Sequence, residues 1–280
     1  MKFPGYPGWF DRNVREKVAD PDADASGYTY FGLKRLPADK KKDAVLDHFN
    51  RVAPRYDFMN TVLSFGIHYA WKKKAVAVLG LKPGDRVLDV CGGTGDLAVY
   101  AAKAAGSNGK VFIYDMNHEM MRAGMARAQN RKYSHRICWI QGDAEQMALG
   151  GDLFDAAMVG FGIRNLTNLK QGLSEIYRVI KPGGRIMCLE FSKPVNPVFR
   201  QIYDLYSFYA MPMIGRLLAG SARSYACLSE TIRMFATAEE LADMLVQTGF
   251  SNVFFHRLTN GIAAVHIGKK SGAPAALKST

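Results

Sequence analysis

Two glycines and two carboxylates are spaced for ligand binding within residues 86–99, which read RVLDVCGGTGDLAV. Asp89 ends a short hydrophobic stretch, Gly93 and Gly95 follow it, and Asp96 begins a helical pattern. Glycine has no Cβ, so the chain can turn tightly there and come close to a bound molecule. The free N–H groups and the positive dipole end of the helix would face that molecule. This segment therefore predicts a nucleotide-like ligand, with Thr94 at the centre of the turn.

The same turn fits two cofactors. Its GxGxxA spacing satisfies the dinucleotide fingerprint, and Asp115 lies about twenty residues downstream, where a ribose-binding acid belongs. NAD is therefore one candidate. Asp89 and Asp96 favour S-adenosylmethionine, because their carboxylates would attract its α-ammonium group and repel a pyrophosphate.

The segments that must position these residues follow in a regular order. Hydrophobic stretches predict five strands, at residues 87–89, 111–114, 137–140, 154–159 and 185–191. Asp115 ends the second strand, where it can accept both ribose hydroxyls, and Asp143 follows the third, where it can accept from the adenine amine. This order favours a methyltransferase over an NAD enzyme.

Composition supports a doubly wound α/β fold. The chain has 280 residues, of which 48% are hydrophobic, enough for one large core with an appended subdomain. It contains no apolar run of 18 residues and no signal peptide. Four cysteines without CxxC spacing predict reduced thiols in a cytoplasmic protein and no metal site.

The net charge of +12 suits either solvated surfaces or an acidic partner. Basic residues gather at residues 40–42, 72–74, 127–136 and 269–278, without any nucleic-acid-binding signature. Among partners, an anionic membrane surface is therefore favoured over nucleic acid, and we expect peripheral contact with the inner face of the cytoplasmic membrane. A homodimer is compatible with the sequence.

The remaining segments frame the sheet. Residues 1–38 are expected to be a flexible extension and residues 271–280 a disordered tail, flanking one domain at 39–270. Within that domain, residues 39–80 predict a helical cap. Residues 193–233 are rich in aromatic residues and methionine and predict a helical lid over an apolar substrate. Pro212 and Gly215 are expected to break this lid into at least two helices. The expected substrate contacts in this lid are Tyr203, Tyr206, Tyr209 and Met213. A closing hairpin at residues 253–267 would add one antiparallel strand.

Several longer motifs resemble the ubiquinone/menaquinone biosynthesis C-methyltransferase family. They include YDFMN at 56–60, SFGIH at 64–68, FGIRN at 161–165, YRVIKPGGR at 177–185, LEFSKP at 189–194, YDLYSF at 203–208 and SETIRM at 229–234. The likeness extends over residues 31–269. It implies a class I S-adenosylmethionine-dependent methyltransferase with a Rossmann-like fold and a mostly parallel sheet. The implied reaction is methylation of a ring carbon of a polyprenylated quinol.

Carried over by position, the resemblance implies cofactor contacts at Thr94, Asp115, Met116, Asp143, Ala144 and Gly160. Asp143 stands where the family often has Asn, and its carboxylate still accepts a hydrogen bond. Gly160 stands where the family can have Ser, which removes a hydroxyl.

The implied reaction requires a group that makes the quinol ring electron-rich. Arg164 follows the fourth strand and is expected to stabilise a phenolate or to relay a proton through water, with Asn165 orienting it. A structural salt bridge is the alternative role for Arg164. Tyr56 and His68 lie in the cap and are further catalytic candidates, His68 because its ordinary pKa suits a base.

Overall fold

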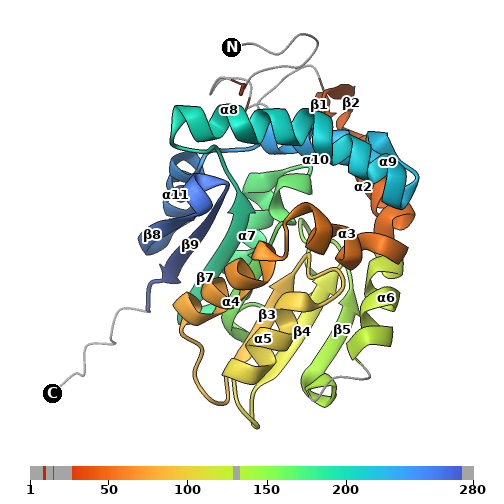
Figure 1. Cartoon of the computed structure of the whole chain (residues 1–280). Coiled ribbons are helices and arrows are strands. Elements are labelled where there is room, and N and C mark those ends of the chain that lie inside the picture. Colours follow the sequence, from red (N-terminus) through yellow and green to blue (C-terminus); the bar gives the residue numbers. More distant parts are fainter. Residues whose placement is uncertain (1–8, 11–14, 16–26, 129–132, 273–280) are drawn as a thin grey trace, which may run out of the picture.

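A computed structural model describes residues 9–10, 15, 27–128 and 133–272 of the chain. Apart from residues 9–10 and 15, the part of the expected flexible extension before residue 27 lies outside the described residues, as does the expected tail beyond residue 272. The described chain forms a layered α/β domain, in which a central sheet has helices on both faces and further helices across one end (Figure 1).

The central sheet has seven strands in the order β5-β4-β3-β6-β7-β9-β8. Strands β3 to β7 pair with one another in parallel, and β9 is antiparallel to both β7 and β8. The strands are β3 (Arg86–Val90), β4 (Lys110–Asp115), β5 (Ile137–Gln141), β6 (Phe154–Gly160), β7 (Ile180–Phe191), β8 (Phe250–Leu258) and β9 (Ala263–Lys270). This confirms the predicted sheet, including its antiparallel closing strand.

Both faces of the sheet are buried, which explains the nearly continuous apolar strands. Successive side chains alternate between faces, so Val87 packs with one layer of helices and Leu88 with the other. The helices that flank the sheet are α4 (Ile67–Leu79), α5 (Asp96–Ala104), α6 (His118–Ala128), α7 (Leu169–Val179) and α11 (Ala238–Gln247). Short 3-10 turns η3 (Ser134–Arg136), η4 (Ile163–Asn165) and η6 (Thr259–Gly261) join other elements.

The N-terminal cap consists of α2 (Ala38–Val52), the 3-10 turn η2 (Ala53–Arg55), α3 (Tyr56–Leu63) and α4. Before it, β1 (Tyr28–Phe31) and β2 (Lys34–Pro37) form an antiparallel hairpin, although no regular structure was expected there. A long-range contact explains the difference, because the backbone N–H of Leu33 donates to Glu230 at 3.0 Å. The sequence of this short hairpin gives no indication that Glu230, almost 200 residues away, is its partner.

The lid contains α8 (Pro197–Leu205), the π-helix η5 (Tyr206–Ala210), α9 (Met211–Ala219) and α10 (Ala222–Met234). The insert forms more than one helix, as predicted, but Gly215 does not break one, and Pro212 lies in the first turn of α9, which continues directly from the π-helix. The π-turn just before Pro212 changes the local hydrogen-bond pattern and accommodates a residue that lacks an N–H donor. Gly215 lies inside α9, where helix packing favours glycine because a Cβ at this position would come 2.1 Å from the Tyr225 ring. The chain turns instead at Gly220, whose φ is +73°.

Arg233 is the largest fully buried side chain and joins the parts of the lid. Its guanidinium donates to Asp204 at 2.5 Å and to the Ser207 hydroxyl at 2.8 Å, and it lies 3.9 Å from the centre of the Phe208 ring. Burial lowers the pKa of Arg233, and Asp204 opposes that shift. The lid therefore depends on one buried and paired charge.

Arg233→Ala should lower the free energy of unfolding by about 3–5 kcal/mol, because it leaves Asp204 without its buried partner. Urea denaturation measures this loss. Arg122 is the matched control, since its side chain is 70% exposed in a pair with Glu119. Arg122→Ala should change stability by less than about 0.5 kcal/mol. Equal effects of the two substitutions would contradict the role assigned to Arg233.

Candidate active site

Two adjoining cavities lie at the carboxyl ends of the parallel strands, beneath the cap and the lid. The larger has a volume of about 720 Å³ and the smaller about 90 Å³. Phe49, Tyr56, Phe161 and Asn165 line both. Open α/β sheets bind their ligands at this edge, so the arrangement can place a cofactor beside a substrate.

The smaller cavity gathers much of the predicted cofactor site. It is lined by Gly93, Asp115, Met116, Ala144 and Gly160, together with residues of α2. Gly93 and Gly95 have φ of +53° and +76°, which L side chains rarely adopt. The backbone N–H of Gly93 donates to Asp115 Oδ2 at 2.7 Å, which fixes the carboxylate beside the turn. A Cβ at Gly160 would come 2.3 Å from the Leu97 Cδ1 methyl, so the serine that the family can have at this position would require the Leu97 side chain to shift.

Four predicted cofactor residues do not line this cavity: Asp89, Thr94, Gly95 and Asp143. Asp89 lies behind the turn, fully buried, and burial raises its pKa well above the ordinary value. The Thr94 hydroxyl donates to Asp57 at 2.8 Å. Asp143 Oδ2 accepts from Lys42 Nζ at 2.6 Å, at the rim of the cavity. Asp89, Thr94 and Asp143 therefore lie around the smaller cavity without facing into it.

Ion pairs attach the cap to the sheet around the smaller cavity. Lys42 contacts both Asp143 and Glu145, and Lys72 Nζ lies 2.9 Å from Asp96 in a buried pair. Arg127 forms an ion pair with Asp57. Each pair has one partner in the cap and one in the sheet domain. Helix α2 thus lies directly over Asp115, and the space left beneath it is narrow.

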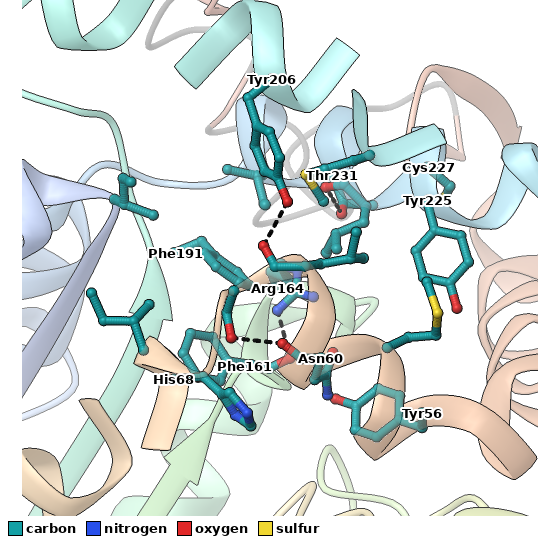
Figure 2. Close-up of a pocket in the computed structure, with 18 of the residues that line it drawn as sticks. Tyr56, Asn60, His68, Phe161, Arg164, Phe191, Tyr206, Tyr225, Cys227 and Thr231 are labelled. Atoms are coloured by element: carbon teal, nitrogen blue, oxygen red, sulfur yellow. Dashed lines mark hydrogen bonds between the residues drawn. The ribbon is translucent and has the colours of Figure 1, made fainter. Parts of the chain in front are cut away.

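The larger cavity is mostly apolar and brings the catalytic candidates together. Tyr56, His68, Arg164 and Asn165 all line it. Figure 2 shows Tyr206 on one side of this cavity, on the lid, and Tyr56 and His68 on the other, with Arg164 between them. An apolar pocket with few convergent polar groups suits an aromatic ring that carries a hydrophobic substituent.

Arg164 is held in place by Glu190. Its Nη1 donates to Glu190 Oε1 at 2.8 Å and to the carbonyl of Phe161 at 2.5 Å. The guanidinium carbon lies 5.3 Å from the centre of the Phe191 ring. Arg164 Nε is buried without a hydrogen-bond partner among the described residues. Arg164 therefore forms the predicted salt bridge, and its side chain also lines the larger cavity.

His68 and Tyr56 are both uncharged in this environment. Burial and the nearby Lys72 lower the pKa of His68 to about 4, so it is neutral near pH 7 and a weak base. Its Nε2 lies 3.3 Å from the Thr61 hydroxyl. Burial raises the pKa of Tyr56, although Lys72 opposes this. His68 is thus poorly suited to removing a quinol proton.

Of the four lid residues expected to contact the substrate, two line the larger cavity. Tyr203 and Tyr206 line the cavity, and the Tyr206 hydroxyl donates to the carbonyl of Leu63 at 2.7 Å. Burial raises the pKa of Tyr203 to about 12. Tyr209 and Met213 are exposed and do not line the cavity. They lie on the face of the lid helices that points away from the cavity, because buried Phe208 and Met211 occupy the inner face.

Glu190 and His48 were not among the predicted site residues. Glu190 lies near the carboxyl end of β7, and Leu189 pairs with Gly160 of β6, whose end leads to Arg164. The strand-end pattern that identified Asp115 could also have found Glu190. His48 lines the larger cavity, and burial together with Arg164 lowers its pKa to about 4. Nothing in the spacing of α2 distinguishes His48 from a core residue.

Solved structures with 15–20% sequence identity share this fold. A SAM-dependent methyltransferase from Aquifex aeolicus superposes with a TM-score of 0.53 at 18% identity, covering 71% of this chain and 89% of its own. The [4+2]-cyclase SpnF superposes with a TM-score of 0.59 at 16% identity, covering 82% of this chain and 96% of its own. The fold alone therefore does not decide the reaction.

Sequence comparison is more specific. The chain is 42% identical over 248 residues to the ubiquinone/menaquinone biosynthesis C-methyltransferase UbiE of Pseudomonas fluorescens strain SBW25, covering 89% of this chain and 97% of that protein. It is also 42% identical to the UbiE of Francisella philomiragia over 86% of this chain and 97% of the relative. The family model described as the ubiE/COQ5 methyltransferase family matches residues 37–270. This chain belongs to the ubiE/COQ5 methyltransferase family.

Proposed function

We propose that this chain transfers a methyl group from S-adenosylmethionine to a ring carbon of a polyprenylated quinol in ubiquinone or menaquinone biosynthesis. The observation that carries the proposal is Arg164, anchored on Glu190 in an apolar cavity that adjoins the Asp115 site. The family and its relatives support the same reaction.

The residues of the smaller cavity match the cofactor chemically. Asp115 is placed to accept hydrogen bonds from the ribose hydroxyls, and Met116 and Ala144 offer apolar surface to the adenine. Asp143 and Lys42 lie at the rim beyond it. When bound, S-adenosylmethionine supplies a methyl group already activated by its positive sulfur. Because α2 covers Asp115 so closely, α2 must move outward for the cofactor to enter.

Arg164 lowers the cost of forming the reactive phenolate. A quinol hydroxyl resembles the phenol of Tyr, with an ordinary pKa near 10, so forming the anion at pH 7 costs about 4 kcal/mol. The guanidinium stays protonated in proteins and cannot take the proton directly. It stabilises the oxyanion, the proton passes to water, and electron density rises on the adjacent carbon. That carbon gains the methyl group as the methyl–sulfur bond breaks and its electron pair stays on the sulfur. The carbon then loses its hydrogen as a proton and the oxygen regains one, so the aromatic quinol is restored and the reaction releases one proton overall.

The tail of such a quinol resides in a membrane, so we place the enzyme in the cytoplasm at the inner membrane face. Among the described residues, no helix is long and apolar enough to cross a bilayer. Contact would therefore be peripheral. A homodimer is compatible with this arrangement. RNA methylation and NAD-dependent oxidation are the alternatives, and neither accounts for the apolar cavity beside Asp115.

Arg164→Ala should lower kcat for quinol methylation by about 100- to 1,000-fold, the usual cost of removing one oxyanion donor. Affinity for S-adenosylmethionine should stay within about twofold, because Arg164 lines only the larger cavity. Steady-state kinetics and calorimetry measure the two effects. Collapse of cofactor binding with Arg164→Ala would show that Arg164 supports the fold or the cofactor instead.

Glu190 should act through Arg164 as a positioning residue. Glu190→Gln removes the charge that anchors the guanidinium, so kcat should fall while the KM for S-adenosylmethionine is retained. The double variant with Arg164→Ala should be no slower than Arg164→Ala alone, since partners in one interaction are not additive. Multiplicative losses in this double-mutant cycle would mean that Glu190 acts independently.

Shortening the isoprenoid tail should raise the KM for the quinol stepwise. Each buried CH2 contributes about 0.8 kcal/mol, so one five-carbon unit buried in the cavity should change KM by more than about tenfold. The Tyr206→Ala variant should reduce this dependence, because Tyr206 lines the cavity between Arg164 and the surface. Equal KM for tailless and long-tailed quinols would contradict an apolar tail site.

A further inference from the structure

The mouth of the larger cavity is identified by residues that are both lining and exposed. Phe65, Ile202 and Ile67 line the cavity, yet their exposed fractions are 83%, 60% and 39%. Their side chains thus form an apolar rim where the cavity opens. Polar residues usually surround an opening that faces water, so this rim indicates an apolar exterior.

Apolar side chains continue from this rim along the outer face of the lid. In Figure 1, α8 and α9 form one nearly continuous rod across the end of the domain. The rod exposes apolar residues at intervals of three or four positions, which places them on one face. They are Val198, Ile202, Leu205, Tyr209, Met213 and Leu217. We call this set, together with Phe65 and Ile67, the outer apolar face.

The backbone at Phe65 presents its ring outward at a conformational cost. Phe65 has φ of +50°, in a region that bulky residues rarely adopt, and the following Gly66 has φ of +75°. The ring lies 5.8 Å from that of Tyr206, which ties the cap to the lid at the rim. Such strain in an exposed aromatic residue is typical of a functional contact.

Charge around the outer apolar face has one sign. Residues 53–80 and 194–229 contain one acidic residue each, Asp57 and Asp204. Both are held in ion pairs, with Arg127 and Arg233 respectively. Exposed basic residues of the same segments are Arg55, Lys73, Lys74, Arg216 and Arg223, of which Arg223 forms an ion pair with Glu230. Apolar surface carried by segments of net positive charge matches the interface of an anionic bilayer.

We infer that the outer apolar face docks on an anionic lipid bilayer and aligns the cavity mouth with the acyl chains. The polyprenyl tail then passes from the bilayer into the cavity without crossing water, a step that rests on the proposed function. Self-association is a poorer fit, because a two-fold contact through this face would oppose its own basic residues.

Flotation with lipid vesicles tests this docking. The full chain should float with vesicles that contain phosphatidylglycerol and phosphatidylcholine, and much less with phosphatidylcholine alone. The triple variant Val198→Gln, Leu205→Gln and Leu217→Gln removes exposed apolar side chains that do not line the cavity. It should weaken partitioning by about tenfold or more, since each buried CH2 contributes to binding. Val246→Gln with Phe254→Gln, on α11 and β8, is the matched control and should float like the wild type.

The outcomes separate docking from catalysis. With a soluble tailless quinol, the triple variant and the wild type should have equal kcat. Absence of wild-type flotation, equal flotation on neutral vesicles, or retained flotation of the triple variant would overturn the docking proposal. Light scattering that shows a dimer converted to a monomer by the triple variant would assign this face to self-association. Failure to methylate any quinol, with flotation as expected, would overturn the proposed function alone.

Discussion

Ion pairs between the cap and the sheet domain are the interaction on which the site depends. Burying a charge is costly unless a partner lies close by, so Lys72 with Asp96 and Lys42 with Asp143 fix how the cap sits on the sheet. The Lys42 pair helps to hold α2 over Asp115, together with hydrogen bonds that the Asn117 amide donates to Leu46 and Asn50 of α2. The same contacts enclose the cofactor site on one side and form a wall of the larger cavity on the other.

This arrangement changes how the net charge of +12 is understood. The basic runs at residues 40–42 and 72–74 were expected at the surface, but some of their side chains point into the protein. Lys41 is 1% exposed, and burial lowers its pKa to about 8, although Glu145 opposes the shift. Lys42 is paired at the rim of the smaller cavity, and Lys72, which lines the larger cavity, is paired with Asp96. What remains outside near the cavity mouth is a smaller basic set around an apolar surface, which is a more specific feature than overall charge.

The sequence predicted the sheet well because strand order and glycine turns are local signals. Gly93 and Asp115 follow directly from where strands end, Gly160 follows from the family resemblance, and the structure brings the three together. The lid was predicted less well, because its aromatic content does not reveal its helical phase. Tyr203 and Tyr206 face the cavity, whereas Tyr209 and Met213 face outward. The need for Gly215 arises from the ring of Tyr225, a contact between two helices that composition cannot reveal.

Methyl transfer to a quinol is the central claim, and isotopic labelling tests it most directly. The chain would be incubated with S-adenosylmethionine labelled in its methyl group and with polyprenylated naphthoquinol and benzoquinol, and the products analysed by mass spectrometry. The account predicts a labelled methyl group on a ring carbon of at least one quinol, strongly reduced with Arg164→Ala. Quinols that stay unlabelled while label enters RNA, or while nicotinamide cofactors are the ones that bind, would contradict it.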